Sequence, residues 1–340
     1  LYQNRDTLTI STGKSVFVQD TIDLLNSKLS VTPAVSYRQI NRDFTNYASN
    51  GSGAGVDYKI NKTYSQALPS LNATLQFTPE TQGFAGVSKN FKAPGNFEYF
   101  SLAQGVTFAN GVGSSTGLAP LTVNPETSTN LDAGFRFRGD AYRASVTGFL
   151  VKFKDRIAVS YDPNTGTSHS WNVGNSTVKG VEVEAGTVPV KGFSAYTSLT
   201  YTSSTTDNNM LASASTTYAT AGKQFPDTPR VMGALSLQYT NGPVLLNLAG
   251  KYTGLRYLTM VNDIAIGGFS TVDFNAAYKL PSDGFFKNPV LRFNVSNLTN
   301  KQFLTASLGS GSSIAINAAG NPYVYPGAPR FFSVTGQSDF

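Results

Sequence analysis

Apolar and polar side chains alternate along most of the chain, and the stretch from Asn124 to Ile157 shows the pattern clearly. The odd positions from 131 to 137 are apolar and the even positions around them are polar: Leu131, Ala133, Phe135 and Phe137 against Asn130, Asp132, Arg136 and Arg138. A period of two is that of a β-strand with one apolar face. After the break at Gly139-Asp140, Tyr142, Ala144 and Val146 resume the alternation. The pattern therefore predicts two antiparallel strands joined by a tight turn.

The same alternation predicts about thirteen strands, each of roughly nine to fourteen residues, which is the length that a tilted membrane strand needs. They are Ser15–Leu24, Leu29–Phe44, Ala67–Thr78, Gly83–Phe91, Thr127–Arg138, Tyr142–Lys154, Val178–Val188, Phe193–Ser203, Arg230–Thr240, Pro243–Gly254, Phe269–Leu280, Val290–Asn297 and Arg330–Phe340. Convincing helical periodicity is found nowhere, so we predict an all-β chain.

The connections between these strands fall into two alternating sets. The short set is Leu25–Lys28, Thr78–Gln82, Gly139–Ala141, Pro189–Gly192, Asn241–Gly242 and Pro281–Pro289. The long set, rich in Gly, Ser, Asn and Thr, is Thr45–Gln66, Lys92–Glu126, Asp155–Thr177, Ser204–Pro229, Leu255–Gly268 and Leu298–Pro329. If consecutive strands pair, the short turns lie at one end of the sheet and the long loops at the other, as in outer-membrane barrels.

Two irregularities interrupt the alternation. At Gly148 the parity slips, because Phe149 and Val151 are apolar while Lys152 is polar. We interpret this as a bulge, or as strand that continues above the membrane, and place Lys152 on the polar face. Asp20 falls on the apolar parity of the first predicted strand, where nothing in the sequence explains it.

The composition fits a chain that does not face water on all sides. Charged residues make up 14% of the 340 residues and aromatic residues 12%, whereas an ordinary soluble domain is about 25% charged. The net charge of +6 is not gathered into basic runs, so we expect no nucleic-acid partner. With no cysteine, disulfides and cysteine-based metal sites are excluded. The first residues show neither an initiating Met nor a signal-peptide pattern, so we expect a mature or truncated segment.

Short motifs are spread over nearly the whole chain. In order they are FVQD, LSVTPAVSYRQ, VSKNFKAPGNFEYF, NPETSTNLDAGFR, WNVGNSTVKGVEVEAG, FPDTPR, FNVSNLTNKQFL and PGAPRFFSVTGQSDF. Together they resemble the C-terminal barrel of TonB-dependent outer-membrane receptors of the siderophore type. The resemblance implies an antiparallel transmembrane β-barrel of about 22 strands filled by an N-terminal plug. Residues 1–340 would then be the C-terminal part of the barrel, with the plug, the TonB box and roughly nine leading strands outside this chain.

The resemblance also implies a function and its partners. The expected protein is a receptor and transporter for a ferric siderophore or similar bulky nutrient in the outer membrane of a Gram-negative bacterium. TonB and the inner-membrane energising complex would act through the absent N-terminal region, and the wall would contact the lipid bilayer. The final aromatic, Phe340, resembles the signal read by the barrel-assembly machinery. We expect neither an enzyme nor a resident cofactor, with iron present only in the transported ferric chelate.

Five basic residues assigned to the lumenal parity are the first candidates for ligand contact: Arg136, Arg138, Lys152, Lys251 and Arg292. Like charges in a narrow, low-dielectric cavity attract anions, and ferric siderophores are often anionic. The competing interpretation, which we weigh equally, is that these residues pair with acids of a plug or of neighbouring strands. Aromatic loop residues are the second set of candidates for ligand capture: Tyr99, Phe100, Trp171 and Tyr323.

Other functions stay open from the sequence. A passive pore is expected if no plug precedes the chain, and the transported ligand could be vitamin B12 or a glycan. A hydrolase would have to use His169, the chain's only histidine, whose neighbours Ser168 and Ser170 point to the opposite face of an extended strand. One histidine without cysteine gives little support to a metal site. A soluble β-sandwich or adhesin-like protein would show the same alternation.

Overall fold

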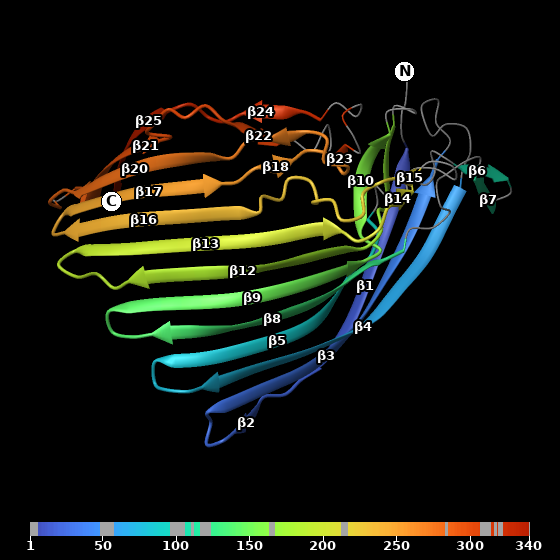
Figure 1. Cartoon of the computed structure of the whole chain (residues 1–340), viewed down its shortest axis with the longest axis horizontal. Coiled ribbons are helices and arrows are strands. Elements are labelled where there is room, and N and C mark those ends of the chain that lie inside the picture. The colour runs from blue at the N-terminus through green and yellow to red at the C-terminus, as the bar shows by residue number, and fades with distance from the viewer. Residues whose placement is uncertain are drawn as a thin grey trace.

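The computed structural model describes residues 6–47, 58–95, 106–109, 112–115, 124–162, 167–211, 217–282, 285–306, 314–315, 318 and 322–339. Its main element is one curved antiparallel sheet in which strands follow one another in sequence order (Figure 1). These strands are β1 (Thr7–Gln19), β2 (Ile22–Leu24), β3 (Leu29–Asn46), β4 (Tyr58–Gln76), β5 (Thr81–Lys92), β8 (Glu126–Arg138), β9 (Tyr142–Lys154), β12 (Ser176–Thr187), β13 (Phe193–Thr206), β16 (Val231–Asn241), β17 (Val244–Thr253), β20 (Phe269–Lys279), β21 (Lys287–Ser296) and β25 (Phe331–Asp339). The all-β, antiparallel prediction is confirmed.

Short strands pair with one another in the long connections. They are β6 (Val106–Ala109), β7 (Val112–Ser115), β10 (Ile157–Asp162), β11 (Thr167–Asn172), β14 (Met210–Leu211), β15 (Thr217–Tyr218), β18 (Arg256–Tyr257), β19 (Ala265–Ile266), β22 (Leu304–Ala306), β23 (Ile314–Ala315) and β24 (Val324–Pro326). Part of the sequence predicted as loop is therefore strand. The predicted loop Thr45–Gln66 is the clearest correction, because β3 and β4 stay paired as far as Asn46 and Tyr58.

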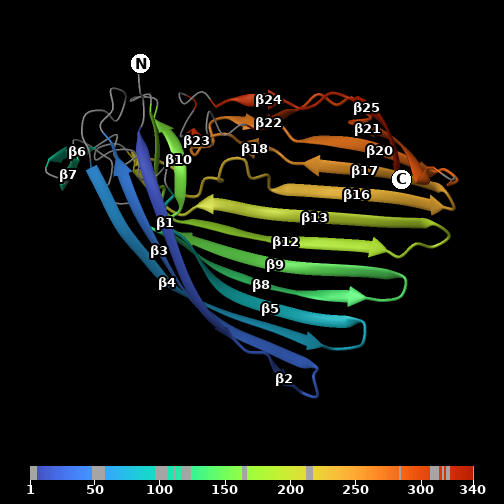
Figure 2. The same cartoon turned by 180° about the vertical axis from the view of Figure 1, so that it is seen from behind.

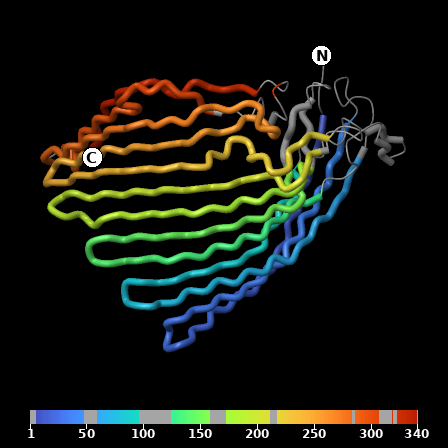
Figure 3. Tube along the Cα trace, in the orientation of Figure 1, coloured from blue at the N-terminus to red at the C-terminus, as the bar shows by residue number. Residues whose placement is uncertain are grey.

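The two ends of the sheet differ as the sequence predicts. The short turns lie along one edge of the molecule and the long connections at the opposite end (Figures 1 and 2). The trace in Figure 3 follows this up-and-down course from β3 to β21. In the part of the chain that the structure describes, no helix is long and apolar enough to cross a membrane.

The sheet has one apolar and one polar face. We call the face that carries Leu131, Phe135 and Val146 the apolar face; these side chains are 48%, 60% and 46% exposed. Aromatic side chains on this face contact each other near the short turns. Phe137 stacks on Tyr142 with ring centroids 5.3 Å apart, and the Phe77–Phe135 and Phe193–Tyr239 centroids are 6.0 and 4.4 Å apart. An apolar band bordered by aromatic residues is typical of the lipid-facing side of membrane barrels.

The bulge expected at Gly148 does not form. β9 pairs without interruption with β8 from Tyr142 to Lys154 and with β12 over Tyr142 to Phe153. Directly opposed residues share a face, so Phe149, opposite Asp132, lies on the polar face, and Lys152, opposite Thr129, lies on the apolar face. The placement of Lys152 on the polar face was therefore wrong. Gly180 makes room for the Phe149 ring, whose ε carbon would lie 2.9 Å from a Cβ at that position.

Asp20 lies at the junction between β1 and β2. Its backbone amide donates to the Pro33 carbonyl at 3.2 Å, which keeps the pairing with β3 continuous. Its carboxylate accepts a hydrogen bond from the Thr21 amide at 2.8 Å. The acid thus satisfies a backbone donor close to the short turn that follows.

Candidate functional site

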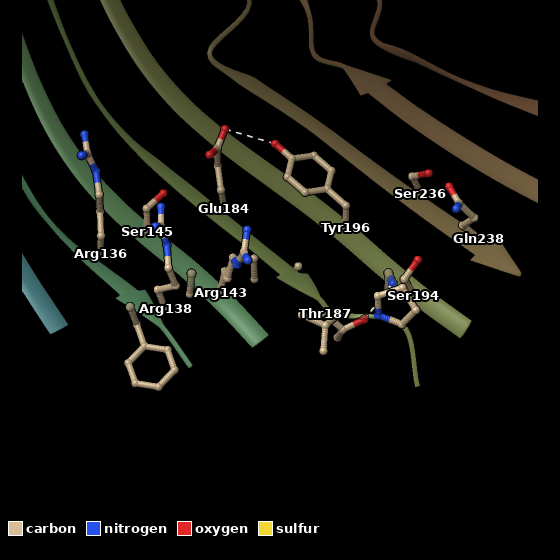
Figure 4. Close-up of a pocket in the computed structure, with 17 residues that line it drawn as sticks. Arg136, Arg138, Arg143, Ser145, Glu184, Thr187, Ser194, Tyr196, Ser236 and Gln238 are labelled. Carbon is tan, nitrogen blue, oxygen red and sulfur yellow. Dashed lines mark hydrogen bonds between the residues drawn. The ribbon is translucent and has the colours of Figure 1, made fainter. Parts of the chain in front are cut away.

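Three arginines gather on the polar face near the short turn between β8 and β9. Arg136 and Arg138 lie two residues apart on β8, and Arg143 on β9 is directly opposite Arg138. All of them line one open pocket of about 690 Å³ (Figure 4). Arg143 was not among the predicted site residues. Its position opposite Arg138 could have identified it, because residues that flank a tight turn at equal distance oppose each other.

Polar groups from β9, β12, β13 and β16 also line this pocket, together with apolar residues such as Phe137 and Val188. The polar groups include Ser145, Glu184, Tyr196, Ser236 and Gln238. Glu184 lies next to Ser145 in the ladder, and its Oε1 atom accepts a hydrogen bond from the Tyr196 hydroxyl at 3.1 Å. In Figure 4 the side chains of Arg136, Arg143, Glu184 and Tyr196 project from the same side of the sheet, whereas Thr187 is directly opposite Tyr142 and so lies on the apolar face. The pocket thus joins three guanidinium groups to neutral hydrogen-bonding groups and a glutamate that Tyr196 already engages.

The arginine cluster, Arg136, Arg138 and Arg143, has no carboxylate partner within the described residues. The one ion pair there joins Arg256 to Asp227, elsewhere in the molecule. Arg136 instead lies over the Phe84 ring, with its guanidinium carbon 4.3 Å from the centroid. Phe84 crosses Gly134, where a Cβ would lie 2.8 Å from the ring's ζ carbon. A guanidinium on an aromatic face keeps its fork of donors free for a carboxylate or another planar anion.

The other predicted basic residues do not join this cluster. Lys251 shares the polar face and lies on the same ladder row as Arg136, through Ser145, Glu184, Ser198 and Ala234. That path crosses five strand spacings, about 24 Å. Arg292 lies further along the sheet, between Ala277 of β20 and Thr335 of β25. Lys152 is on the apolar face, so it is withdrawn as a lumenal residue.

The predicted loop residues are only partly described. Tyr99, Phe100 and Phe340 lie outside the described residues. The backbone of Trp171 is in β11, opposite Ala158, and His169 is opposite Ser160. Tyr323 is 59% exposed next to β24. These positions do not test a role in ligand capture. In the described part of the chain, no three His, Cys, Asp or Glu residues are grouped to hold a metal.

Residues that the sequence did not single out hold the bases of the long connections together. Arg256 donates to Asp227 at 3.1 Å and to the Leu304 carbonyl at 3.0 Å. Burial raises the pKa of Asp227, and the neighbouring Arg256 opposes that shift. Arg156 lies 3.5 Å from the Phe225 ring centroid, and burial lowers its pKa. These contacts join residues far apart in sequence, so no local sequence pattern predicts them.

Comparison with known proteins agrees with this architecture. The family model described as TonB dependent receptor-like, beta-barrel matches residues 2–298. The ferric enterobactin receptor PirA of Pseudomonas aeruginosa is 26% identical over 283 residues, 78% of this chain and 36% of that protein. The probable TonB-dependent siderophore receptor PirA of Acinetobacter baumannii is 30% identical over 133 residues, 33% of this chain and 17% of that protein.

Solved structures show the same fold at low sequence identity. The ferric citrate transporter FecA is 20% identical, with a TM-score of 0.73 over 98% of this chain and 46% of that one. The siderophore receptor PiuA of Acinetobacter baumannii is 15% identical, with a TM-score of 0.72 over 97% and 43%. The chain spans 36% of the length of the Pseudomonas aeruginosa receptor and less than half of either solved chain. It belongs to the TonB-dependent receptor-like β-barrel family.

Proposed function

We propose that this chain forms the C-terminal part of the barrel wall of an outer-membrane receptor that takes up a ferric siderophore. Its strands would cross the outer membrane of a Gram-negative bacterium, with the apolar face in lipid and the polar face toward the lumen. A plug and further strands would complete the barrel. Iron would enter only as cargo, and the proposal involves no covalent chemistry by this chain.

The arginine cluster on the polar face is the observation that carries this proposal. Three guanidinium groups line one pocket, and none of them forms an ion pair within the described residues; the one carboxylate that lines the pocket, Glu184, accepts a hydrogen bond from Tyr196. Such a group attracts anions, more strongly where low-dielectric walls focus the field. An anionic ferric chelate moving through the lumen fits that requirement. The two curated relatives are a ferric enterobactin receptor and a probable siderophore receptor, which supports the same ligand class.

Energy for transport would come from TonB and its inner-membrane complex, acting on a segment outside residues 1–340. The barrel wall would then be the static partner, and the plug the part that moves. The arginine cluster lies near the short turns, so it could contact acidic residues of a plug as well as the passing chelate. The two roles differ in what removal of the arginines changes: chelate binding weakens if they contact the chelate, and limited proteolysis becomes faster if they hold the plug.

The test uses the complete receptor purified from the outer membrane. Binding of ferric triscatecholate, ferric dicitrate and a ferric hydroxamate is measured by quenching of intrinsic fluorescence, with vitamin B12 and an oligosaccharide as comparison ligands. We expect saturable binding of at least one ferric chelate and impaired growth of a deletion strain under iron limitation. Failure to bind any ferric chelate, with unchanged growth, would overturn the siderophore assignment. Steady conductance through the unmodified receptor in planar bilayers would instead indicate a passive pore.

A further inference from the structure

Four lysines lie together on the apolar face, at the end near the long connections. Lys152 and Lys154 are on β9, Lys89 is on β5 and Lys179 is on β12. Their face follows from the ladder, because residues directly opposite each other share a face. Lys89 and Lys152 flank Thr129 of β8, and Lys179 is opposite Leu150. We call these four residues the lysine cluster.

The ladder also sets the spacing within this cluster. Lys152 and Lys179 are diagonal neighbours on adjacent strands, which places them about 7–8 Å apart. Lys89 and Lys152 are separated by one intervening strand, so their backbones lie about 10 Å apart. Small hydroxyl residues fill the positions between: Thr127, Thr129 and Thr177. The spacing would let several ammonium groups approach one phosphorylated headgroup.

No carboxylate neutralises these lysines within the described residues, where Arg256–Asp227 is the one ion pair. The acidic group facing this region is Asp207, at the end of β13, and its Oδ2 atom accepts a hydrogen bond from the Thr177 hydroxyl at 2.9 Å. Glu126, on the polar-face parity of β8, accepts the Ile157 amide at 2.7 Å. Lys152, Lys154 and Lys179 are exposed. Like charges so close repel one another unless an external anion lies among them.

The position of the lysine cluster relative to the apolar band determines which anion can reach it. Toward the short turns, the same face carries the exposed apolar residues Leu131, Val146 and Val181. Lysine in the middle of such a band is costly, but near its edge the cost falls to almost nothing. There the side-chain stems cover apolar surface while the ammonium groups extend to the headgroups. The lysine cluster therefore lies where the band meets the headgroup layer.

We propose that the lysine cluster binds the phosphate groups of a phosphorylated lipid headgroup in the leaflet on the side of the long connections. The inference rests on the membrane placement of the proposed function and is independent of which ligand is transported. Phosphate carries the required negative charge, and lysine binds it as a point charge without needing planar geometry. The threonine hydroxyls add donors between the charges.

The test measures lipid retained by the complete receptor with native mass spectrometry in detergent, after titration with lipid A carrying two phosphates. The variant Lys152→Gln with Lys179→Gln is compared with the matched control Lys14→Gln with Lys59→Gln. The control lysines are exposed on the same face but lie apart from each other, opposite Gln39 and Thr45 of β3. We expect the cluster variant to retain lipid A roughly 30-fold more weakly and the control to match the unmodified receptor.

Three further results complete the test. Lipid A without phosphate should be retained weakly by every variant, and inorganic phosphate at equal concentration should not displace the lipid. Equal retention by the cluster variant and the control would overturn the proposal, as would displacement by inorganic phosphate. Ferric chelate binding is measured on the same preparations. If the cluster variant loses lipid A but still binds the ferric chelate, the lipid site is supported independently of transport. If the unmodified receptor retains lipid A but binds no ferric chelate, the transport proposal fails and the lipid proposal stands.

Discussion

The arginine cluster and the lysine cluster lie on opposite faces of neighbouring strands and at opposite ends of them. Arg136 and Arg143 point to the polar face near the short turns, whereas Lys152 and Lys179 lie on the apolar face near the long connections. Both clusters lack a carboxylate partner within the described residues. They differ in their surroundings: the arginine cluster faces the aqueous lumen, whereas the lysine cluster faces the lipid headgroups.

The side-chain chemistry follows the same division. Arg136 is held over Phe84, which orients a planar fork toward the lumen. The lysines have flexible stems between threonines, which suits a headgroup that moves in the plane of the membrane. The role of a basic residue in this wall therefore depends on the face of the sheet that carries it and on its position along the strand between the short turns and the long connections.

The largest expected effect comes from placing a positive charge at the wrong height on the apolar face. Val146 lies within the exposed apolar band, and its neighbour Thr147 lies on the polar face opposite Glu182. Val146→Arg should lower the free energy of unfolding by about 2–4 kcal/mol, because the charge enters the hydrocarbon layer. Thr147→Arg is the matched control and should change it by about 0.5 kcal/mol or less.

The measurement is urea-induced unfolding of the complete receptor in phosphatidylcholine vesicles, followed by tryptophan fluorescence. Similar losses in both variants would contradict the assignment of faces on β9. A large loss in Thr147→Arg alone would reverse it, and would return Lys152 to the lumen.

The same hairpin shows how far the sequence could predict the fold. Alternation placed β8 and β9 within one residue of their observed ends, because one face must stay apolar over the whole membrane thickness. It failed beyond Gly148, where we assigned faces from local polarity. Above the apolar band, polarity no longer marks the face, since Phe149 lies on the polar face and Lys152 on the apolar one. The face of each side chain follows from uninterrupted pairing with the neighbouring strands, and it cannot be deduced from the sequence of one strand.

The candidate site was predictable only in part, for a related reason. Arg136 and Arg138 were recognised by parity, but the cluster forms only when the turn brings Arg143 opposite Arg138. Lys251 and Arg292 lie on the predicted polar face but on strands far from the arginine cluster, so their role as ligand contacts stays a prediction. The contacts of Arg256 with Asp227 and Leu304 join long connections whose relative positions no local pattern specifies.

A paired arginine sharpens the contrast with the unpaired clusters. Arg256 is buried and bonded to Asp227, whereas Arg136 is exposed. Arg256→Gln should lower the free energy of unfolding by about 1–3 kcal/mol, because it leaves the partly buried carboxylate of Asp227 without its cation. Arg136→Gln, the matched substitution, should stay within about 0.5 kcal/mol of the unmodified receptor. Equal losses in the same urea experiment would show that Arg136 has a structural partner that the described residues do not contain.

Two variants, one without the arginine cluster and one without the lysine cluster, test which cluster contributes to ferric chelate binding. The variant Arg136→Gln, Arg138→Gln and Arg143→Gln should weaken ferric chelate binding about tenfold, since exposed charge contacts contribute up to about 1 kcal/mol each. Lys152→Gln, Lys154→Gln and Lys179→Gln remove the same charge from the other face and should leave the chelate Kd unchanged. Added salt should narrow the difference, because screening weakens exposed contacts.

The arginine variant also separates the two roles of the lumenal cluster. If the arginines hold an acidic surface of a plug, the chelate Kd should stay constant while limited proteolysis of the receptor becomes faster. Unchanged binding with unchanged proteolysis would contradict both roles. Loss of chelate binding in the lysine variant would show that charge on either face affects the ligand at long range. The claim that only the arginine cluster contributes to chelate binding would then be wrong.

The smallest expected effect concerns pH and the pair at the base of the long connections. Burial raises the pKa of Asp227 above its ordinary value of 3.8, and Arg256 opposes the shift. The folded protein therefore holds this proton more tightly than the unfolded chain does. The resulting stabilisation is fully present below pH 3.8 and is lost as the pH rises through the raised folded value. Asp227→Asn removes the titration, so the free energy of unfolding of this variant should depend less on pH in that window.

The measurement compares urea unfolding of Asp227→Asn with that of Asp207→Asn between pH 3.5 and pH 6, a range chosen to bracket the ordinary value of 3.8. Asp207 shows a hydrogen bond from Thr177 and no ion pair, which makes it the matched control. A variant whose pH dependence equals that of the control would mean that Arg256 fully offsets the burial of Asp227. The loop-base pair would then be electrostatically neutral to folding, and the contrast between paired and unpaired arginines would rest on packing and hydrogen bonding alone.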